Sequence, residues 1–235
     1  MGATGKKTCK ANENSYFVFM SNASSVSQKN AAILERLAAR YPAPRSQLDA
    51  GTPWEILVST VLAAQCTDVR VNLVTPQLFR RWPSPAELAL AGQAELEEVI
   101  HSTGLYRSKA KHLIAAARLI VNEYQGRVPE TMPDLLRLPG VARKTANIVL
   151  WGGFGRNEGV AVDTHVRRIA FRLGLTLSER PEVIERDLMG LFPRETWGDL
   201  NHRLVWFGRE VCLARKPACP ICELADLCPR CGLAQ

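Results

Sequence analysis

The sequence lacks the features of a membrane or exported protein. Within its 235 residues, no apolar run approaches the roughly 18 residues that a membrane-spanning helix needs. The longest early apolar patch, residues 16–20 (YFVFM), is too short for the core of a signal peptide, and no small-residue cleavage site follows it closely. These absences predict a soluble, intracellular protein that has no membrane partner.

Signals for β-structure are also scarce. No segment alternates apolar and polar residues convincingly between turn signals, so we do not expect a sheet. From residue 30 onward, the apolar residues recur at helical spacing instead. Helix-start signals accompany them, such as the capping box with proline at residues 52–55 (TPWE). The pattern predicts an all-α fold of about ten helices.

The composition is ordinary except for its charge. Hydrophobic residues at 46% and charged residues at 23% exclude a disordered chain, a collagen-like fibre and a coiled-coil rod. At ~150 residues per domain, the length fits one large domain or two small ones. The net charge of +7 and the pI near 9.2 indicate a polyanionic partner, most simply nucleic acid. Ribosome association or solubility alone would give a similar balance.

The cysteines gather at one end of the chain, where five of the seven fall within the last 24 residues. A disulfide scaffold would spread them over a small secreted domain, so a metal site is the better interpretation. Their spacing is Cys212-x6-Cys219-x2-Cys222-x5-Cys228. This spacing suits a cubane iron–sulfur cluster. A zinc site built from two C-x2-C pairs, which would include Cys231, and a set of inert thiols remain open alternatives.

The most specific segment is residues 138–146 (LPGVARKTA). Pro139-Gly140 predicts a tight turn between two helices, and the first N–H groups of the second helix then point outward as a site for a phosphate. Gly140 lets the backbone approach that phosphate closely. Such an anchor contacts phosphate and sugar and carries no base-sequence information. An ordinary interhelical turn is the alternative.

Two ionisable residues stand at predicted helix starts. Lys144 falls in the first turn of the helix after the turn, where the helix dipole disfavours a cation. A lysine tuned toward neutrality can act as a nucleophile and form a Schiff base, although a solvated lysine on a phosphate is the simpler interpretation. Asp163 ends the apolar segment 160–162 and precedes a helix, so it is a helix cap that could also face a cleft.

Taken together, these segments resemble endonuclease III, the iron–sulfur branch of the helix-hairpin-helix DNA glycosylases. Further matching segments are residues 62–68 (LAAQCTD), 103–110 (TGLYRSKA) and 214–217 (ARKP). All occur in the family order and spacing and cover roughly residues 30 to 230. The resemblance favours iron–sulfur over zinc and implies a [4Fe–4S] cluster on Cys212, Cys219, Cys222 and Cys228.

The resemblance also implies a two-domain helix-hairpin-helix DNA glycosylase fold with the DNA cleft between the domains. Residues 46–156 would form a six-helix barrel that contains the hairpin at about residues 132–151. Residues 30–45 and 157–235 would form the helical cluster domain. The Lys-, Asn- and Ser-rich residues 1–29 are expected to be a flexible basic N-terminal tail.

By the same resemblance, Lys144 matches the nucleophile of the bifunctional members and Asp163 matches their essential carboxylate. Two residues, Gln65 and Leu105, would fill the space that an extruded base leaves, and we call them the wedge residues. Further DNA contacts are expected at Leu138, Gly140, Val141, Arg143, Arg215 and Lys216.

The chain departs from the family pattern at one hairpin position. Ala142 stands where the family usually has a second glycine, and we expect its methyl group to strain the turn or crowd the phosphate. Cys231 is an additional thiol beyond the four expected ligands.

The implied function is a bifunctional DNA glycosylase and AP lyase of base excision repair. It would excise oxidised pyrimidines through a lysine Schiff base and cut the strand 3′ of the abasic site by β-elimination. The expected partner is double-stranded DNA with damaged bases or abasic sites, bound by a cytoplasmic, nucleoid-associated monomer.

A monofunctional mismatch glycosylase and a non-catalytic DNA-binding module are the alternatives. The first normally lacks the lysine and carries a further C-terminal domain, so Lys144 and the end at Gln235 disfavour it; Lys144 with Asp163 disfavours the second.

Overall fold

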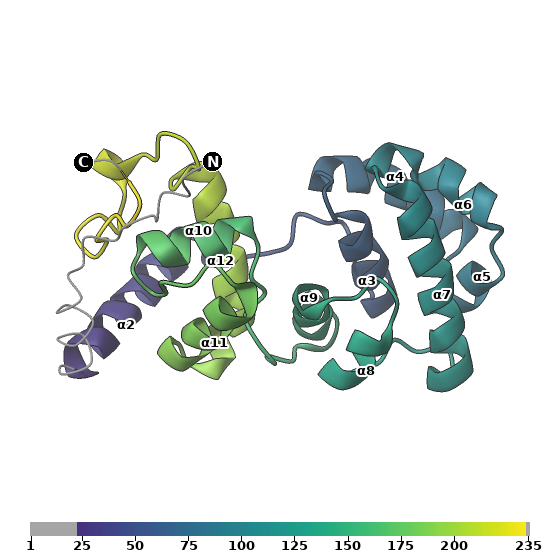
Figure 1. The fold of residues 1–235 in the computed structure, drawn as a ribbon, viewed down its shortest axis with the longest axis horizontal. Coiled ribbons are helices and arrows are strands. Elements are labelled where there is room, and N and C mark those ends of the chain that lie inside the picture. Colours follow the sequence, from purple (N-terminus) through teal and green to yellow (C-terminus); the bar gives the residue numbers. More distant parts are fainter. Residues whose placement is uncertain (1–22, 234–235) are drawn as a thin grey trace, which may run out of the picture. The chain divides into compact units, whose positions relative to one another are not determined.

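The structure, a computed structural model, describes residues 23–233. Across these residues the chain is helical and contains no strand, which confirms the predicted all-α class. No helix in this range is long and apolar enough to cross a membrane. The chain divides into two compact units, shown in Figure 1, each with its own hydrophobic core. Unit 2 is Ser46–Glu158, and unit 1 combines the chain up to Arg45 with the chain from Gly159 onward.

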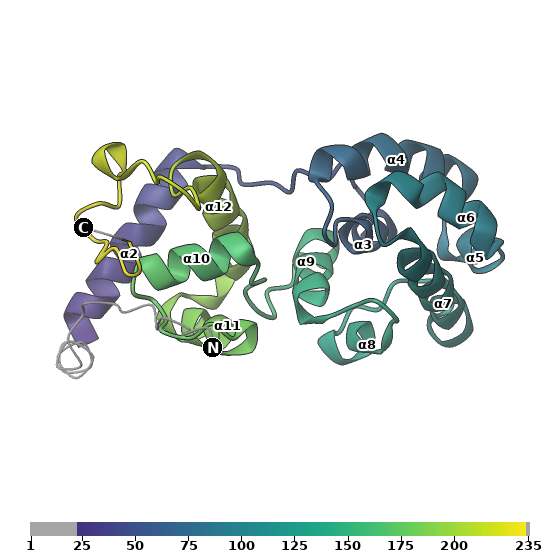
Figure 2. The same cartoon turned by 45° about the horizontal axis from the view of Figure 1, so that its top comes forward.

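Unit 2 is built around one buried helix. This helix is α3, of which most side chains are buried, and in Figure 2 the other helices of the unit surround it. Its sequence is apolar enough to lack a wide polar face, which is typical of a central helix. The helices of unit 2 are α3 (Pro53–Leu62), α4 (Asp68–Arg81), α5 (Pro85–Ala89), α6 (Gln93–Ile100), the 3-10 turn η1 (His101–Thr103), α7 (Tyr106–Tyr124), α8 (Met132–Arg137) and α9 (Arg143–Phe154).

The start of α3 follows the predicted capping box. The hydroxyl of Thr52 accepts a hydrogen bond from the backbone N–H of Glu55 at 3.2 Å, and the Glu55 carboxylate accepts one from the N–H of Thr52 at 3.0 Å. These reciprocal bonds satisfy donors that the first turn of a helix leaves open. The local sequence therefore determines where the central helix of unit 2 begins.

Unit 1 is assembled from two separate stretches of the chain. Its helices are α2 (Ala23–Arg40), α10 (Thr164–Arg172), α11 (Pro181–Leu191), η2 (Arg194–Thr196), α12 (Trp197–Glu210) and η3 (Cys219–Ile221). Helix α2 packs its apolar face, with Ile33 and Leu37 fully buried, into the same core as α10, α11 and α12. After α12 the chain continues mainly as turns to residue 233.

The first helix starts earlier than expected. Most of the predicted tail, residues 1–29, lies outside the described residues, but from Ala23 the chain is already helical. The reason is tertiary contact: the ammonium of Lys29 donates a hydrogen bond to the carbonyl oxygen of Leu173 at 2.9 Å, and Asn30 is buried. Burial of this lysine lowers its pKa. Such contacts extend α2 into a stretch without apolar periodicity.

Candidate functional site

The hairpin predicted from residues 138–146 is present between α8 and α9. At the turn, the N–H of Val141 donates to the carbonyl of Leu138 at 3.1 Å. Gly140 has φ +82°, a conformation that other residues rarely adopt. A Cβ added there would also lie 3.0 Å from the Cβ of His112 on α7. Glycine is therefore required at this position by both the backbone conformation and the packing against α7.

Helix α9 begins without a side-chain cap. Its N-cap residue is Ala142, which offers no acceptor, and the first intrahelical bond runs from the N–H of Ala146 to the Ala142 carbonyl at 2.9 Å. The first turn can thus direct backbone N–H groups toward an anion. Ala142 itself has φ −98° and ψ 171°, an extended conformation that any residue adopts. The expectation that its methyl group strains the turn is therefore wrong.

The hairpin residues predicted to contact DNA differ in whether their side chains are accessible. Leu138 and Val141 are buried in the core of unit 2, so only their backbone groups are available to a ligand. Arg143 and Lys144, in the first turn of α9, are exposed. The hairpin thus offers backbone groups at the turn and two cationic side chains directly after it.

The wedge residues occupy two turns of unit 2. Gln65, which follows the end of α3, has φ +54°, and Leu105, the N-cap residue of α7, has φ +49°. Both side chains are exposed, and Leu105 keeps 55% of its surface accessible despite being a large apolar residue. A left-handed conformation is uncommon for residues other than glycine. At both residues the backbone therefore departs from the conformation of an α-helix.

Asp163 is the N-cap of α10 in unit 1. Its Oδ1 accepts a hydrogen bond from the backbone N–H of Val166 at 2.8 Å, and the side chain is half-buried. Two histidines lie close enough to interact electrostatically with it. Burial lowers the pKa of His165 and of His202, whereas the negative charge of Asp163 raises both. The carboxylate is therefore held in place from one side and has two imidazoles nearby whose pKa burial lowers.

The four predicted ligand thiols line one cavity of unit 1. Cys212, Cys219, Cys222 and Cys228 share it with mainly apolar neighbours that include Phe207 and Leu224. Burial raises the pKa of the Cys222 and Cys228 thiols, and nearby cysteines raise it further. Thiolates in such a site need a cationic partner, which a metal centre supplies. Among the described residues, no three His, Cys, Asp or Glu side chains are grouped to hold one metal ion.

Hydrogen-bond donors face these sulfurs. The guanidinium of Arg172 donates to Cys212 Sγ at 3.3 Å and to the carbonyls of Leu213 and Ala214 at 2.7 and 2.9 Å. The backbone N–H of Arg230 donates to Cys228 Sγ at 3.4 Å. Donors of this kind stabilise thiolate ligands of an iron–sulfur cluster. Although the described side chains are not grouped closely enough to hold one metal ion, the four thiols line one cavity, and their chemistry, enclosure and hydrogen bonds fit a cluster on these four cysteines.

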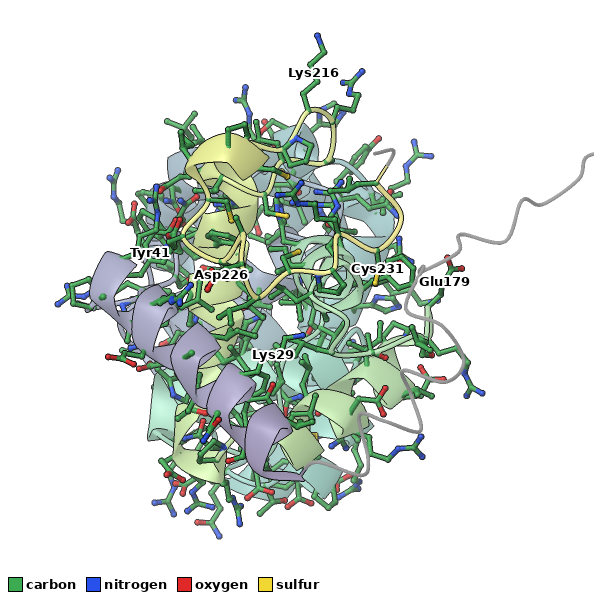
Figure 3. All side chains as sticks on the ribbon, turned by 90° about the vertical axis from the view of Figure 1, so that its left-hand side faces the viewer. Lys29, Tyr41, Glu179, Lys216, Asp226 and Cys231 are labelled. Atoms are coloured by element: carbon green, nitrogen blue, oxygen red, sulfur yellow. The ribbon has the colours of Figure 1, made fainter. Side chains whose placement is uncertain are left out.

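The loop between the first two ligands presents two cations. Arg215 and Lys216 are both exposed, and Lys216 has φ +52°. Figure 3 shows Lys216 at the outer end of the loop that follows α12, extending away from the protein. The arrangement suits contact with a phosphate backbone.

Comparison with known proteins defines the class. The family model described as HhH-GPD superfamily base excision DNA repair protein matches residues 58–194, which include the hairpin and Asp163. The model described as iron-sulfur binding domain of endonuclease III matches residues 212–228, the segment from the first ligand thiol to the fourth. The chain is therefore a base excision DNA repair protein with an iron–sulfur binding domain.

Individual relatives narrow the assignment. The chain is 52% identical to endonuclease III of Synechocystis sp. over 86% of its own length and 92% of the relative's. It is 39% identical to endonuclease III of Escherichia coli K12, over 85% and 94%. A solved non-covalent endonuclease III–DNA complex and a trapped endonuclease III–DNA covalent intermediate are each 39% identical, with TM-scores of 0.81 and 0.82, and cover 86% of this chain and 94% and 95% of theirs.

The chain belongs to the endonuclease III family. It is a bifunctional base excision DNA glycosylase and lyase, it binds DNA, and its cofactor is a [4Fe–4S] cluster. These findings confirm the resemblance drawn from the sequence, its implied fold and the iron–sulfur choice over zinc.

Some residues of these sites carry no sequence signal. Arg172 is the last residue of α10, and neither its charge nor its spacing predicts that it binds Cys212 and the segment after it. Lys109 lies in residues 103–110 (TGLYRSKA), one of the segments that resemble the family, yet nothing in that segment indicates that its side chain is buried. His202 stands among polar residues of α12, and only the packing of unit 1 brings it near Asp163.

Proposed function

We propose that the enzyme removes oxidised pyrimidines from duplex DNA and that Lys144 is its nucleophile. The observation that carries the proposal is the placement of Lys144: an exposed amine in the first turn of α9, directly after the Gly140 turn. A phosphate bound at that turn would fix the DNA strand beside the amine. The position also matches the lysine of the bifunctional family members.

The proposed chemistry is a substitution followed by an elimination. The neutral amine of Lys144 attacks C1′ of the sugar, the C1′–N bond to the base breaks, and the base leaves with the electron pair and takes up a proton. The C1′–O4′ bond then breaks with its electron pair going to O4′, which takes up the proton that Nζ gives up, and a Schiff base forms between Nζ and C1′. The iminium acidifies the C2′ protons, so that β-elimination breaks the C3′–O bond and cuts the strand on the 3′ side.

Asp163 is proposed to assist the first step. A carboxylate near the sugar stabilises the positive charge that develops there, and before the attack it can accept the proton that the Lys144 ammonium must lose to become a neutral amine. Only one of its oxygens is used as a helix cap in the structure, so the other remains available for this role. The [4Fe–4S] cluster has a structural part, since closing the loop on the thiols presents Arg215 and Lys216 to phosphates.

The target base must leave the duplex before the amine reaches its sugar. We propose that the wedge residues Gln65 and Leu105 enter the space left behind, while Gly140, the backbone of Leu138 and Val141, and the side chain of Arg143 hold phosphates. The enzyme acts as a monomer on chromosomal DNA in the cytoplasm. A mismatch-specific monofunctional enzyme or a non-catalytic module would need no amine at position 144.

Borohydride trapping tests the proposal. Purified protein is incubated with duplexes that contain an oxidised pyrimidine, an oxidised purine, an adenine mismatch or an abasic site, and the imine is reduced with borohydride. We expect a covalent complex and 3′ cutting with the oxidised pyrimidine and the abasic site. Lys144→Gln, which retains a similar length but cannot form an imine, should abolish both and leave damaged-duplex binding largely intact.

Lys111→Gln is a suitable control because Lys111 is also an exposed lysine of unit 2. It should trap as the wild type does. A trapped complex with Lys144→Gln would show that another amine is the nucleophile and would overturn the mechanism. Base release from the mismatch without strand cutting would support the monofunctional alternative instead.

A further inference from the structure

Lys109 of α7 is a buried cation whose ammonium joins two segments of unit 2. Only 4% of its surface is accessible. Its Nζ donates a hydrogen bond to the carbonyl oxygen of Leu62 at 2.7 Å and another to the carbonyl oxygen of Thr103 at 2.8 Å. Both acceptors are themselves buried. One side chain thus connects segments that lie far apart in the sequence.

The two acceptors stand directly before the turns that carry the wedge residues. Leu62 is the last residue of α3, and the turn after it leads to Gln65. Thr103 is the last residue of η1, and Gly104 and Leu105 follow it. Because a helix end leaves carbonyl groups without backbone partners, the Lys109 ammonium can fix both ends at once.

Keeping this cation in the interior costs free energy. Burial lowers the pKa of Lys109, and no carboxylate of the described residues forms an ion pair with it. Its hydrogen-bond partners there are neutral carbonyls. The thiol of Cys66, the residue after Gln65, is close enough to interact electrostatically with it. A hydrophobic side chain would fill this place without that cost. The two hydrogen bonds to the carbonyls are therefore the reason to have a lysine at position 109.

We propose that Lys109 is a positioning residue for DNA distortion: it holds the turns of Gln65 and Leu105 at a fixed mutual spacing, so that both enter the duplex as a preformed pair. The inference rests on the proposed function of the wedge residues. Positioning of this kind matters because a displacement of about 1 Å in a group that orients the substrate can cost roughly 100-fold in rate. The simpler alternative is that Lys109 only stabilises the fold of unit 2.

The first experiment compares two lysines of α7. Lys109→Met preserves the side-chain length but removes the charge and both hydrogen bonds, and Lys111→Met removes an exposed charge from the same helix. Single-turnover cutting of an oxidised-pyrimidine duplex is measured at a temperature where circular dichroism shows both variants folded. We expect Lys109→Met to be slower than Lys111→Met by roughly 10- to 100-fold. Equal rates would overturn the proposal.

A double-mutant cycle separates positioning from general stabilisation. Lys109→Met is combined with Gln65→Ala and Leu105→Ala, which remove the side chains that Lys109 is proposed to position. If Lys109 acts through them, its substitution should have little further effect on the rate in this background. An undiminished effect would mean that Lys109 serves the fold alone, and the proposal would fail.

A fluorescence measurement tests the same inference without catalysis. The probe is a duplex with a tetrahydrofuran abasic analogue opposite 2-aminopurine, whose fluorescence responds to the loss of stacking when side chains enter the duplex. At saturating protein, Lys109→Met should give a smaller change than Lys111→Met. An inactive wild type would refute the proposed function, yet this measurement would still decide on Lys109, and a full response from Lys109→Met would overturn its role.

A second variant guards against misfolding. Lys109→Gln retains one hydrogen-bond donor group but not the charge or the reach to both carbonyls. It should give rates and fluorescence changes between those of the wild type and Lys109→Met. If Lys109→Met does not fold, Lys109→Gln is compared with Lys111→Gln in both assays, and equal values would overturn the proposal.

Discussion

The carboxylate of Asp163 and the backbone N–H of Val166 form a hydrogen bond of 2.8 Å that caps α10. The same carboxylate is the proposed partner of the nucleophile. Asp163 therefore has a capping role and a proposed catalytic role. Substitutions that affect only one of these roles can separate them.

Asp163→Asn should remove most of the glycosylase and lyase activity and leave the melting temperature nearly unchanged, because Asn caps a helix about as well as Asp. Asp163→Ala should lose the activity and also about 1 kcal/mol of stability, because alanine offers no cap. Activity is measured by strand cutting and stability by thermal denaturation. An active Asp163→Asn enzyme would assign Asp163 to capping alone.

The purified protein should be yellow-brown and contain about four irons per chain, as expected for a [4Fe–4S] cluster. Cys219→Ser should lose the iron and destabilise the region after α12, because the metal and the fold of this region are coupled. Cys231→Ser, which replaces a cysteine that does not line the ligand cavity, should retain the iron. Iron analysis and the visible spectrum check this; zinc in place of iron, or loss of iron from Cys231→Ser, would refute the ligand set.

Lys216→Ala should weaken binding to damaged and undamaged duplexes about equally and reduce the salt slope by about one unit, since one phosphate contact is lost. Arg186→Ala, which removes an exposed charge from α11, serves as the matched control. Binding is followed by fluorescence anisotropy over a range of salt concentrations. A change in preference among lesions would place Lys216 in the base pocket instead.

Gly140→Ala should destabilise unit 2 by roughly 1–2 kcal/mol and weaken DNA binding, because the residue has φ +82° and the added methyl group meets His112. Ala142→Gly should leave DNA affinity unchanged, because the extended backbone at this position accepts either residue. Denaturant titration and binding assays test both variants. A large gain in affinity from Ala142→Gly would show that the methyl group crowds the phosphate.

Local signals predicted much of the fold. The capping box at Thr52 and the turn at Gly140 depend on residues close in sequence, and both are present in the structure. The start of α2 was predicted too late because its first turns are stabilised by contacts such as that of Lys29 with Leu173, which no local period reveals. Helix boundaries depend on such long-range partners more than helix existence does.

In the candidate sites, too, residues close together in the sequence were predicted, whereas residues that reach the site from distant segments were not. The four cysteines that the family resemblance implied as ligands line one cavity, and they are close together in the sequence. The supporting groups escaped prediction because they come from elsewhere: Arg172 reaches Cys212 from α10, and Lys109 reaches Leu62 from α7. A long polar side chain that will bond buried carbonyls has the same appearance in a sequence as one that faces water.

Unit 1 is made from two stretches of chain, and this has a consequence for synthesis on the ribosome. Helix α2 emerges first, but the core that covers Ile33 and Leu37 includes α12, which emerges after the whole of unit 2. At about 5–20 residues per second, the apolar face of α2 waits roughly 10 to 30 seconds for its partner. During that interval unit 2 can complete its fold, while the nascent α2 is the segment that a chaperone has reason to hold.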